Sequence, residues 1–198
     1  MLQAQSRASE ARLRQFRVAV LETQSAAREQ LVSTVAETGI EVCVEGPLRE
    51  NIVALIREMG CDAALVGIDA PHATEIQLAP ALDCALVFCS GNTGPEAVIA
   101  AQKIGAMAFL LKPIRPKQVI PTLTIATSLF REAQFLRRAL AERKIIDRAK
   151  GKLMEHQRFT EDAAFRWLRQ RAMDTRTRIA DVAREVLGAP DERRARPS

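Results

Sequence analysis

Short apolar runs alternate with amphipathic stretches along the first two thirds of the chain. The runs predict strands at residues 16–21, 40–44, 63–68, 85–89 and 107–111, and the stretches between them predict helices at 25–37, 47–59 and 96–103. Because nearly every strand position is apolar, the strands should form a parallel sheet with helices on both faces. The pattern therefore predicts an α/β fold, a doubly wound five-stranded parallel sheet, with any ligand beyond the C-terminal strand ends.

A long helix is predicted after the fifth strand, from residue 114 to residue 143. Leu129, Ala133, Leu136 and Leu140 follow one another at spacings of four and three, as in the seam of a coiled coil. The seam is shorter than the roughly three or four heptads of an extended coiled coil. We expect this helix to pair two copies of the chain in a homodimer, with packing on its own preceding domain as the alternative.

Three short amphipathic helices are predicted between Ile145 and Leu187. The second follows Thr160, whose hydroxyl suits an N-cap, and the third begins near Thr177 and ends at Gly188. The apolar residues that share the predicted buried faces are Ile145, Ile146, Ala149, Leu153, Ala164, Phe165, Leu168, Ala172, Ile179, Val182, Ala183, Val186 and Leu187. This pattern predicts a compact three-helix module.

Basic side chains cover the opposite faces of these helices, at Arg148, Lys150, Lys152, Arg166, Arg169, Arg171, Arg176, Arg178 and Arg184. The formal net charge of the chain is +5, which fits an anionic partner because Lys and Arg neutralise phosphates. Aromatic residues make up 4% of the chain, which argues against a domain that binds bases mainly by stacking. Charge leaves two alternatives open, a nucleic-acid-binding module and a solvated face on a helical dimer module.

Four ordered sequence blocks in this module resemble the ANTAR domain, the RNA-binding output module of bacterial transcription antiterminators. They are residues 149–154 (AKGKLM), 164–165 (AF), 168–173 (LRQRAM) and 182–183 (VA). The resemblance implies a core of Ala149, Leu153, Ala164, Phe165, Leu168, Ala172, Val182 and Ala183. It also implies RNA binding, for which we expect contacts from Arg148, Lys150, Arg169, Arg171, Arg176 and Arg178. Trp167 departs from the family pattern, and we interpret it as packing, with base stacking as the alternative.

The first domain resembles the receiver domain of bacterial response regulators over about residues 17–129. Lys112 and Pro113 match the Lys-Pro pair that follows the fifth strand of receivers. Ser90 takes the place of the Ser/Thr switch residue after the fourth strand, and Pro71 matches the Pro of the third-strand loop.

The metal site of a receiver is incomplete in this sequence. A working receiver holds Mg²⁺ with an acidic pair after the first strand, because Mg²⁺ requires hard oxygen ligands. Here Glu22 and Thr23 stand at the two positions, so one carboxylate is lost. We therefore expect no cofactor and no Mg²⁺.

The phosphoacceptor of a receiver is also replaced. With Asp62 and Pro71 as the outer anchors of the family spacing, Gly67 falls at the acceptor position, and glycine has no side chain to phosphorylate. Asp69 lies two residues later and is an alternative acceptor, because a two-residue slip preserves strand facing. Its other interpretation is a loop carboxylate or a helix N-cap. Without a phosphorylated partner, Lys112 is expected to be a structural cation.

The expected organisation is a flexible leader (1–15), a receiver-like domain (16–125), a coiled-coil linker helix (126–144), an ANTAR-like RNA-binding domain (145–188) and a disordered tail (189–198). The leader lacks the apolar segment of a secretory signal, and no apolar run reaches the roughly 18 residues of a membrane span. The four cysteines, Cys43, Cys61, Cys84 and Cys89, form no C-x-x-C pair. We expect buried, reduced thiols in a cytoplasmic protein.

The resemblances together imply an antiterminator that binds hairpins in leader mRNA and is controlled by a ligand-sensing partner protein. Two alternatives remain: a DNA-binding response regulator controlled by Asp phosphorylation, and a protein-interaction adaptor. No enzyme is expected, because the chain has no P-loop, no Gly-rich dinucleotide motif and no nucleophile–base–acid set.

Overall fold

The computed structural model describes residues 16–68, 77 and 79–188. The chain divides into two compact units between Glu132 and Ala133, inside the long helix α6 (Pro116–Gln157). The expectations for the leader (1–15), for Asp69 and Pro71, and for the tail (189–198) fall outside the described residues.

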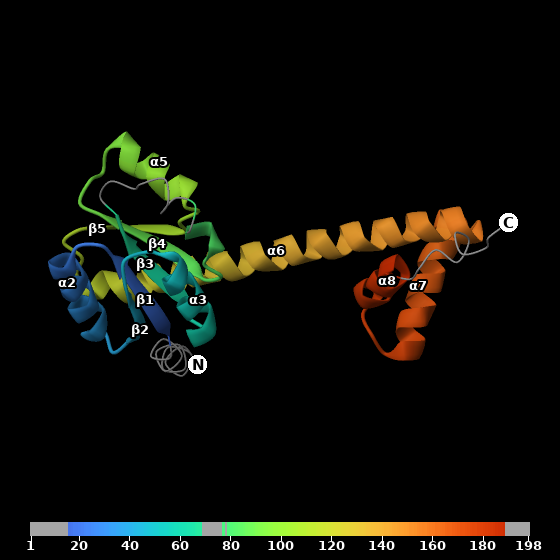
Figure 1. Cartoon of the computed structure of the whole chain (residues 1–198), viewed down its shortest axis with the longest axis horizontal. Helices are drawn as coiled ribbons and strands as arrows, with labels where there is room; N and C mark the ends of the chain where they lie inside the picture. Colours follow the sequence, from blue (N-terminus) through green and yellow to red (C-terminus); the bar gives the residue numbers. More distant parts are fainter. Residues whose placement is uncertain (1–15, 69–76, 78, 189–198) are drawn as a thin grey trace, which may run out of the picture. The chain divides into compact units, whose positions relative to one another are not determined.

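A five-stranded parallel sheet forms the centre of the first unit (Figure 1). Its strands are β1 (Arg17–Glu22), β2 (Glu41–Gly46), β3 (Ala63–Gly67), β4 (Ala85–Ser90) and β5 (Ala108–Leu111), in the spatial order β2-β1-β3-β4-β5. Every residue of β3 and β4 is buried, as expected for central strands with both faces covered. The predicted doubly wound sheet is confirmed.

Helices cover both faces of this sheet. The helices α3 (Glu50–Met59) and α5 (Pro95–Lys103) pack on one face, in a cluster with Phe88. The helix α2 (Ser25–Ala36) and the N-terminal part of α6 pack on the other face. A short 3-10 helix, η1 (Ala79–Ala81), precedes β4. Full burial of an aliphatic side chain such as Leu123 of α6 contributes about 1.5–3 kcal/mol, so both faces stabilise the unit.

The start of α3 differs from the prediction. We expected the helix to begin at Pro47, but it begins at Glu50, after Arg49 in an extended conformation. Leu48 is buried in the core, and the chain stays extended until this side chain has entered it. The predicted end is confirmed, because Gly60 closes α3 with φ +63°, a left-handed conformation that costs glycine little.

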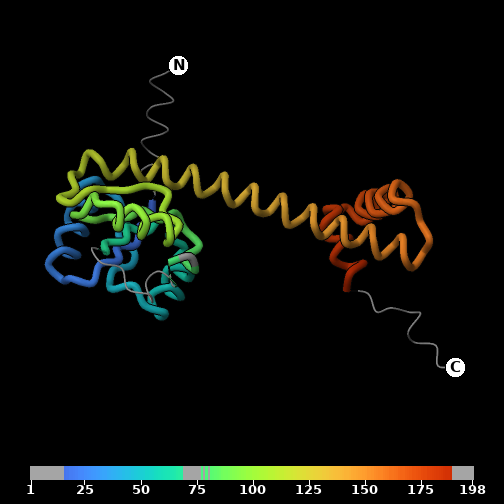
Figure 2. Tube along the Cα trace, turned by 90° about the horizontal axis from the view of Figure 1, so that it is seen from above, coloured from blue at the N-terminus to red at the C-terminus, as the bar shows by residue number. Residues whose placement is uncertain are grey.

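The helix α6 is one uninterrupted helix from residue 116 to residue 157 (Figure 2). We expected the helix to end near Arg143 and a new one to begin near Ile145. No proline lies between residues 122 and 157, and Gly151 costs only about 1 kcal/mol in a helix, so nothing in the sequence ends α6 earlier. Among the described residues, no helix is both long and apolar enough to cross a membrane.

The second unit packs the C-terminal part of α6 against α7 (Glu161–Thr175) and α8 (Ile179–Gly188). The predicted N-cap of α7 is confirmed: the Oγ1 atom of Thr160 accepts a hydrogen bond from the N–H of Ala163 at 3.2 Å. Arg176 ends α7 with φ +53°, and its N–H donates to the end of the helix. The first helix of the predicted three-helix module is therefore the end of α6, and the module itself is confirmed.

Candidate nucleic-acid interface and receiver-like pocket

The carboxyl ends of β1 and β3 bring Glu22 and Gly67 side by side, as paired residues in adjacent strands. A Cβ atom placed on Gly67 would lie 2.2 Å from Oε2 of Glu22, far inside van der Waals contact. The carboxylate of Glu22 therefore occupies the space into which a side chain at position 67 would project. Gly67, which we predicted to stand at the acceptor position, thus has the carboxylate of Glu22 in the space beside it.

Both oxygens of the Glu22 carboxylate are engaged. Oε2 lies 2.7 Å from Nζ of Lys112, and Oε1 accepts the N–H of Gln24 at 3.1 Å. The Glu22 side chain is 4% exposed and that of Lys112 is 22% exposed, so the pair lies mostly out of water. A buried carboxylate requires such partners, because desolvation otherwise disfavours its charge.

The other receiver-motif residues surround this pair without adding a second carboxylate. Ser90 is buried at the end of β4, and its Oγ accepts the N–H of Asn92 at 3.0 Å. Thr23 is exposed, and Pro113 follows Lys112 through a cis peptide bond. Among the described residues, no group of three or more His, Cys, Asp or Glu side chains is placed to hold a metal ion.

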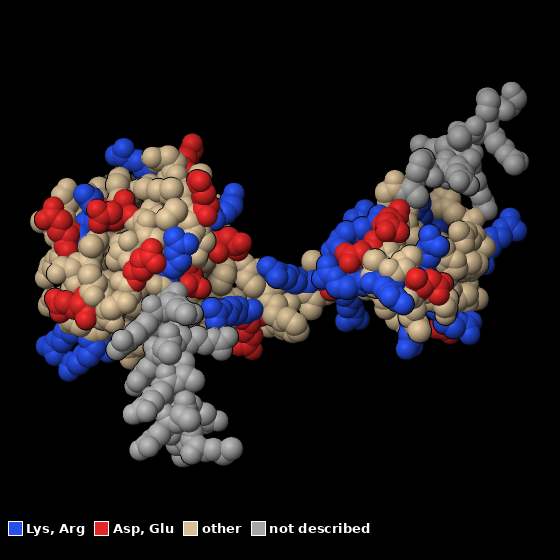
Figure 3. Space-filling view, turned by 90° about the horizontal axis from the view of Figure 1, so that it is seen from below, with Lys and Arg blue, Asp and Glu red and all other residues tan. Residues whose placement is uncertain are grey.

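The second unit carries the six basic residues expected to contact RNA, and Figure 3 shows Lys and Arg side chains over it, with acidic side chains between them. The structure separates the six into two groups. Lys150 and Arg178 are engaged by carboxylates. Arg148, Arg169, Arg171 and Arg176 are exposed, and their side chains make no hydrogen bond or ion pair with any described residue.

Lys150 joins two helices of the second unit. Its Nζ lies 2.8 Å from Oδ1 of Asp147, one turn earlier in α6, and 2.9 Å from Oε1 of Glu161, the first residue of α7. The Lys150 side chain is 16% exposed. Its hydrogen bonds to Asp147 and Glu161 raise the pKa of the ammonium group above its usual value, and the bond to Lys150 lowers the pKa of Asp147. These contacts place Lys150 between α6 and α7 rather than on an open surface.

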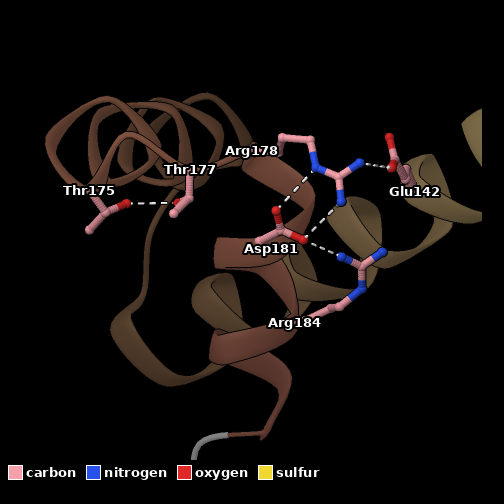
Figure 4. A network of polar contacts seen from close by, with 6 residues as sticks. All are labelled: Glu142, Thr175, Thr177, Arg178, Asp181 and Arg184. Carbon is pink, nitrogen blue, oxygen red and sulfur yellow. Dashed lines mark hydrogen bonds and ion pairs between the residues drawn. The ribbon is translucent and has the colours of Figure 1, made fainter.

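Arg178 belongs to a second ionic network, at the start of α8 (Figure 4). Its Nε lies 3.1 Å from Oδ2 of Asp181, and its terminal nitrogen lies 3.2 Å from Oε1 of Glu142 in α6. Asp181 also pairs with Arg184. The hydrogen bond to Arg178 lowers the pKa of Asp181. The network connects α8 to α6 and holds Arg178 against them.

The predicted core of the module is buried, with one correction. Relative exposure is between 0 and 5% at Ala149, Leu153, Ala164, Leu168, Ala172, Val182 and Ala183. Phe165, which we predicted to belong to this core, is 42% exposed. It follows Ala164 in α7 and is turned by about 100° from it around the helix axis, so it falls at the edge of the apolar face.

A groove that the sequence did not predict lies on α7. It has a volume of about 560 Å³ and is lined by Phe159, Ala163, Arg166, Trp167, Arg169, Gln170 and Met173. Trp167, which we interpreted as packing, is 36% exposed. The sequence shows the helical spacing of Ala163, Arg166, Gln170 and Met173. However, the apolar residues that predict the core of the module lie on the opposite face of α7.

The seam predicted for the coiled coil is uncovered. Leu129, Leu136 and Leu140 of α6 are 44, 53 and 60% exposed. Apolar side chains at this spacing normally pack against a partner helix.

Comparison with known proteins identifies the family. The ANTAR domain profile matches residues 134–187. The transcriptional regulatory protein PdtaR of Mycobacterium tuberculosis is 30% identical over 190 residues, which cover 89% of this chain and 93% of PdtaR. The chain belongs to the PdtaR family of ANTAR-domain regulators. The nitrate regulatory protein of Klebsiella oxytoca is 44% identical over 52 residues, 26% of this chain and 13% of that protein.

Solved structures identify the fold of the first unit. The signal receiver domain of a modulated diguanylate cyclase from Desulfovibrio desulfuricans superposes with a TM-score of 0.52 at 18% identity, covering 60% of this chain and 98% of that domain. The receiver domain of the response regulator NarL from Mycobacterium tuberculosis superposes with a TM-score of 0.50 at 24% identity, covering 58% of this chain and 97% of that domain. The first unit therefore has the receiver fold.

The molecule is a transcriptional regulator with a receiver domain and an ANTAR domain. The ANTAR match begins at residue 134, within the segment that we expected to be a linker, and includes Leu136 and Leu140. Two of the three exposed leucines of α6 thus belong to the ANTAR domain, whereas Leu129 precedes it.

Proposed function

We propose that this regulator is an RNA-binding antitermination protein. Its ANTAR domain binds hairpins in nascent leader mRNA and prevents a terminator hairpin from forming. The observation that carries this proposal is the set of exposed guanidinium groups on the ANTAR unit, at Arg148, Arg169, Arg171 and Arg176, which make no ion pair with any described residue. Arginines without acidic partners are available to phosphates, and their planar groups can also stack on unpaired bases.

Control of transcription follows from competition between two RNA structures. A protein that binds one structure and not the other shifts their populations by its differential binding free energy. A difference of about 5.5 kcal/mol changes a ratio of 1:99 into 99:1, which is within the range of specific RNA binding. The protein therefore needs no catalytic step, and its action is stoichiometric.

The receiver domain acts without phosphorylation in this proposal. Glu22 fills the space beside Gly67, and its carboxylate already holds Lys112, so the described part of the pocket offers no free pair of carboxylates for Mg²⁺. Regulation then comes from a ligand-sensing partner protein that binds the regulator in the cytoplasm and keeps it from RNA. Pairing of two chains through Leu129, Leu136 and Leu140 presents two ANTAR domains to paired hairpins.

The first test is binding of the purified protein to the leader RNA of its neighbouring genes, at two salt concentrations. A loop-scrambled RNA and duplex DNA of equal length serve as controls. We expect loop-dependent RNA binding that weakens with salt. A preference for duplex DNA would support the DNA-binding alternative, and equal, weak binding to all three would support a protein-interaction adaptor.

The second test addresses phosphorylation. Protein incubated with labelled acetyl phosphate should incorporate no label, in the presence or absence of Mg²⁺. Incorporation that disappears in the Asp69→Ala variant would contradict control by a partner alone and would assign Asp69 as the phosphoacceptor.

A further inference from the structure

The groove on α7 faces away from the core of the ANTAR unit. Ala164, Leu168 and Ala172 bury one face of the helix. Ala163, Arg166, Gln170 and Met173 recur at spacings of three and four on the opposite face and line the groove, with Phe159 at the end that precedes α7. Phe159 packs against the core cluster, but the other apolar residues of the groove, Ala163, Trp167 and Met173, do not belong to that cluster. The chemistry of the groove therefore calls for an explanation outside the fold.

The groove combines an aromatic platform with positive charge. Trp167 is 36% exposed and has the largest aromatic surface among the residues that line it. Arg166 and Arg169 are exposed, and their side chains make no hydrogen bond or ion pair with any described residue. None of the described residues that line the groove is Asp or Glu. An aromatic ring flanked by two guanidinium groups matches a nucleotide, which has an apolar face and an adjacent negative charge.

Gln170 adds a hydrogen-bonding group in a fixed orientation. Its side-chain nitrogen donates to Oδ1 of Asp174 at 2.8 Å. Because a carboxylate accepts and cannot donate, this contact fixes which end of the amide is nitrogen. The second N–H and the carbonyl oxygen of Gln170 remain for another partner. A side-chain amide with one donor and one acceptor is suited to the edge of a nucleobase.

A second copy of the chain fits this groove less well. In a two-fold symmetric contact the same patch meets itself, so Arg166 and Arg169 would face the same two arginines of the other copy. The like charges of these four guanidinium groups would repel one another across the contact. The exposed leucines of α6, at Leu129, Leu136 and Leu140, are the better surface for self-association, because they follow the spacing of a coiled-coil seam.

We propose that this groove, the Trp167 groove, holds one unpaired nucleobase of a stem-loop RNA. Trp167 stacks on the base, Gln170 bonds to its edge, and Arg166 and Arg169 contact the flanking phosphates. The inference rests on the proposed RNA-binding function and adds to it the position of a loop base. It makes Trp167 a specificity-determining residue, since a base that is paired in a helix cannot enter the groove.

The protein carries its own probe of this contact. Trp167 is the only tryptophan in the chain, and there is no tyrosine, so the intrinsic emission excited at long wavelength comes from one side chain. The experiment titrates full-length protein with the leader RNA of its neighbouring genes and follows this emission. The control RNA is the same molecule with its loops annealed to complementary strands, which keeps the phosphates and removes the unpaired bases. We expect the emission to be quenched by the first RNA and unchanged by the second.

Variants then separate the groove from the rest of the surface. Trp167→Ala should weaken binding about 5- to 150-fold, the range expected for loss of one stacked base, whereas Trp167→Phe retains most of the affinity. The matched control is Phe165→Ala, which removes another exposed aromatic from α7 outside the groove. It should bind RNA like the parent protein. Thermal unfolding of each variant establishes that it is folded at the assay temperature.

The outcomes distinguish this inference from the function on which it rests. Absence of RNA binding by the parent protein would overturn the antitermination proposal itself. Parent-like binding by Trp167→Ala, with unchanged emission in the parent protein, would overturn the groove and leave antitermination standing. Emission that changes with protein concentration in the absence of RNA would also overturn the groove, because it would make Trp167 part of a contact between two chains.

Discussion

Oε2 of Glu22 lies 2.7 Å from Nζ of Lys112, in the space that a side chain at Gly67 would enter. The Glu22 side chain thereby fills the space beside Gly67, where we predicted the acceptor position, and engages the lysine that follows the fifth strand. The Glu22–Lys112 pair therefore occupies the described part of the receiver pocket. Its geometry leads to two predictions about stability.

Lys112→Met should destabilise the receiver domain by about 2–3 kcal/mol, because the buried Glu22 carboxylate loses its cationic partner. Urea unfolding followed by circular dichroism measures the change. The double variant Glu22→Gln/Lys112→Met should recover much of the loss. Lys117→Met, at an exposed lysine in the first turn of α6, is the control and should change stability little. A Lys112→Met variant as stable as the control would contradict this account of the pair.

Gly67→Ala should destabilise the domain by about 1–3 kcal/mol, because the new methyl group collides with the Glu22 carboxylate. The same substitution should cost less in a Glu22→Ala background, and a double-mutant cycle measures the difference. Gly91→Ala is the matched control, since a Cβ there meets no atom within 4 Å. Equal costs in both backgrounds would show that the two positions do not interact.

Arg171→Gln should weaken RNA binding without changing stability, whereas Lys150→Gln should lower stability without changing the salt dependence of RNA binding. Arg171 is exposed and its side chain makes no hydrogen bond or ion pair with a described residue, so its loss should reduce the slope of log affinity against log salt by about 1 and leave the Tm unchanged. Lys150 bridges Asp147 and Glu161, so its loss should lower the Tm of the ANTAR domain and leave the salt slope unchanged. A reduced slope in Lys150→Gln with an unaltered Tm would make Lys150 an RNA contact.

Leu140→Glu should convert a dimer into a monomer, because it places a charge within the apolar seam of α6. Sedimentation velocity at several protein concentrations measures the change. Phe135→Glu is the control: Phe135 is 70% exposed on the same helix but lies outside the spacing of the seam. Loss of the dimer in both variants, or in neither, would place the interface elsewhere.

Stability of the receiver domain should fall as the pH rises above about 9. Burial raises the pKa of the Cys84 thiol to about 12, and burial likewise raises that of Cys89 to about 12. Below pH 9 both the folded and the unfolded chain keep these protons, whereas between about 9 and 12 only the unfolded chain releases them. Denaturation at pH 8 and pH 10 measures the loss. Cys84→Ala should reduce the difference between the two pH values, and an unchanged difference would contradict the assignment.

The parallel sheet could be predicted because nearly all-apolar runs separated by helical patterns have few other solutions. The filling of the receiver pocket by Glu22 could not be predicted, although both Glu22 and Gly67 were recognised as motif positions. The sequence showed that Gly67 has no side chain, but only the pairing of β1 with β3 shows that Glu22 fills its place.

The basic residues of the ANTAR domain show the same limit. Helical spacing placed Lys150 and Arg178 on polar faces, together with Arg148 and Arg171. Whether a cation is available depends on carboxylates that arrive from another helix, such as Glu161 for Lys150 and Glu142 for Arg178. The prediction that Phe165 is buried was wrong for a related reason. A residue at the edge of an apolar face can be buried or exposed with the same helical spacing.

The contact between Glu22 and position 67 also constrains how this receiver can evolve. An aspartate introduced at position 67 meets the Glu22 carboxylate, and a change at Glu22 by itself supplies no acceptor. We therefore expect an acidic side chain at position 67 to require a second substitution, at Glu22, that vacates this space.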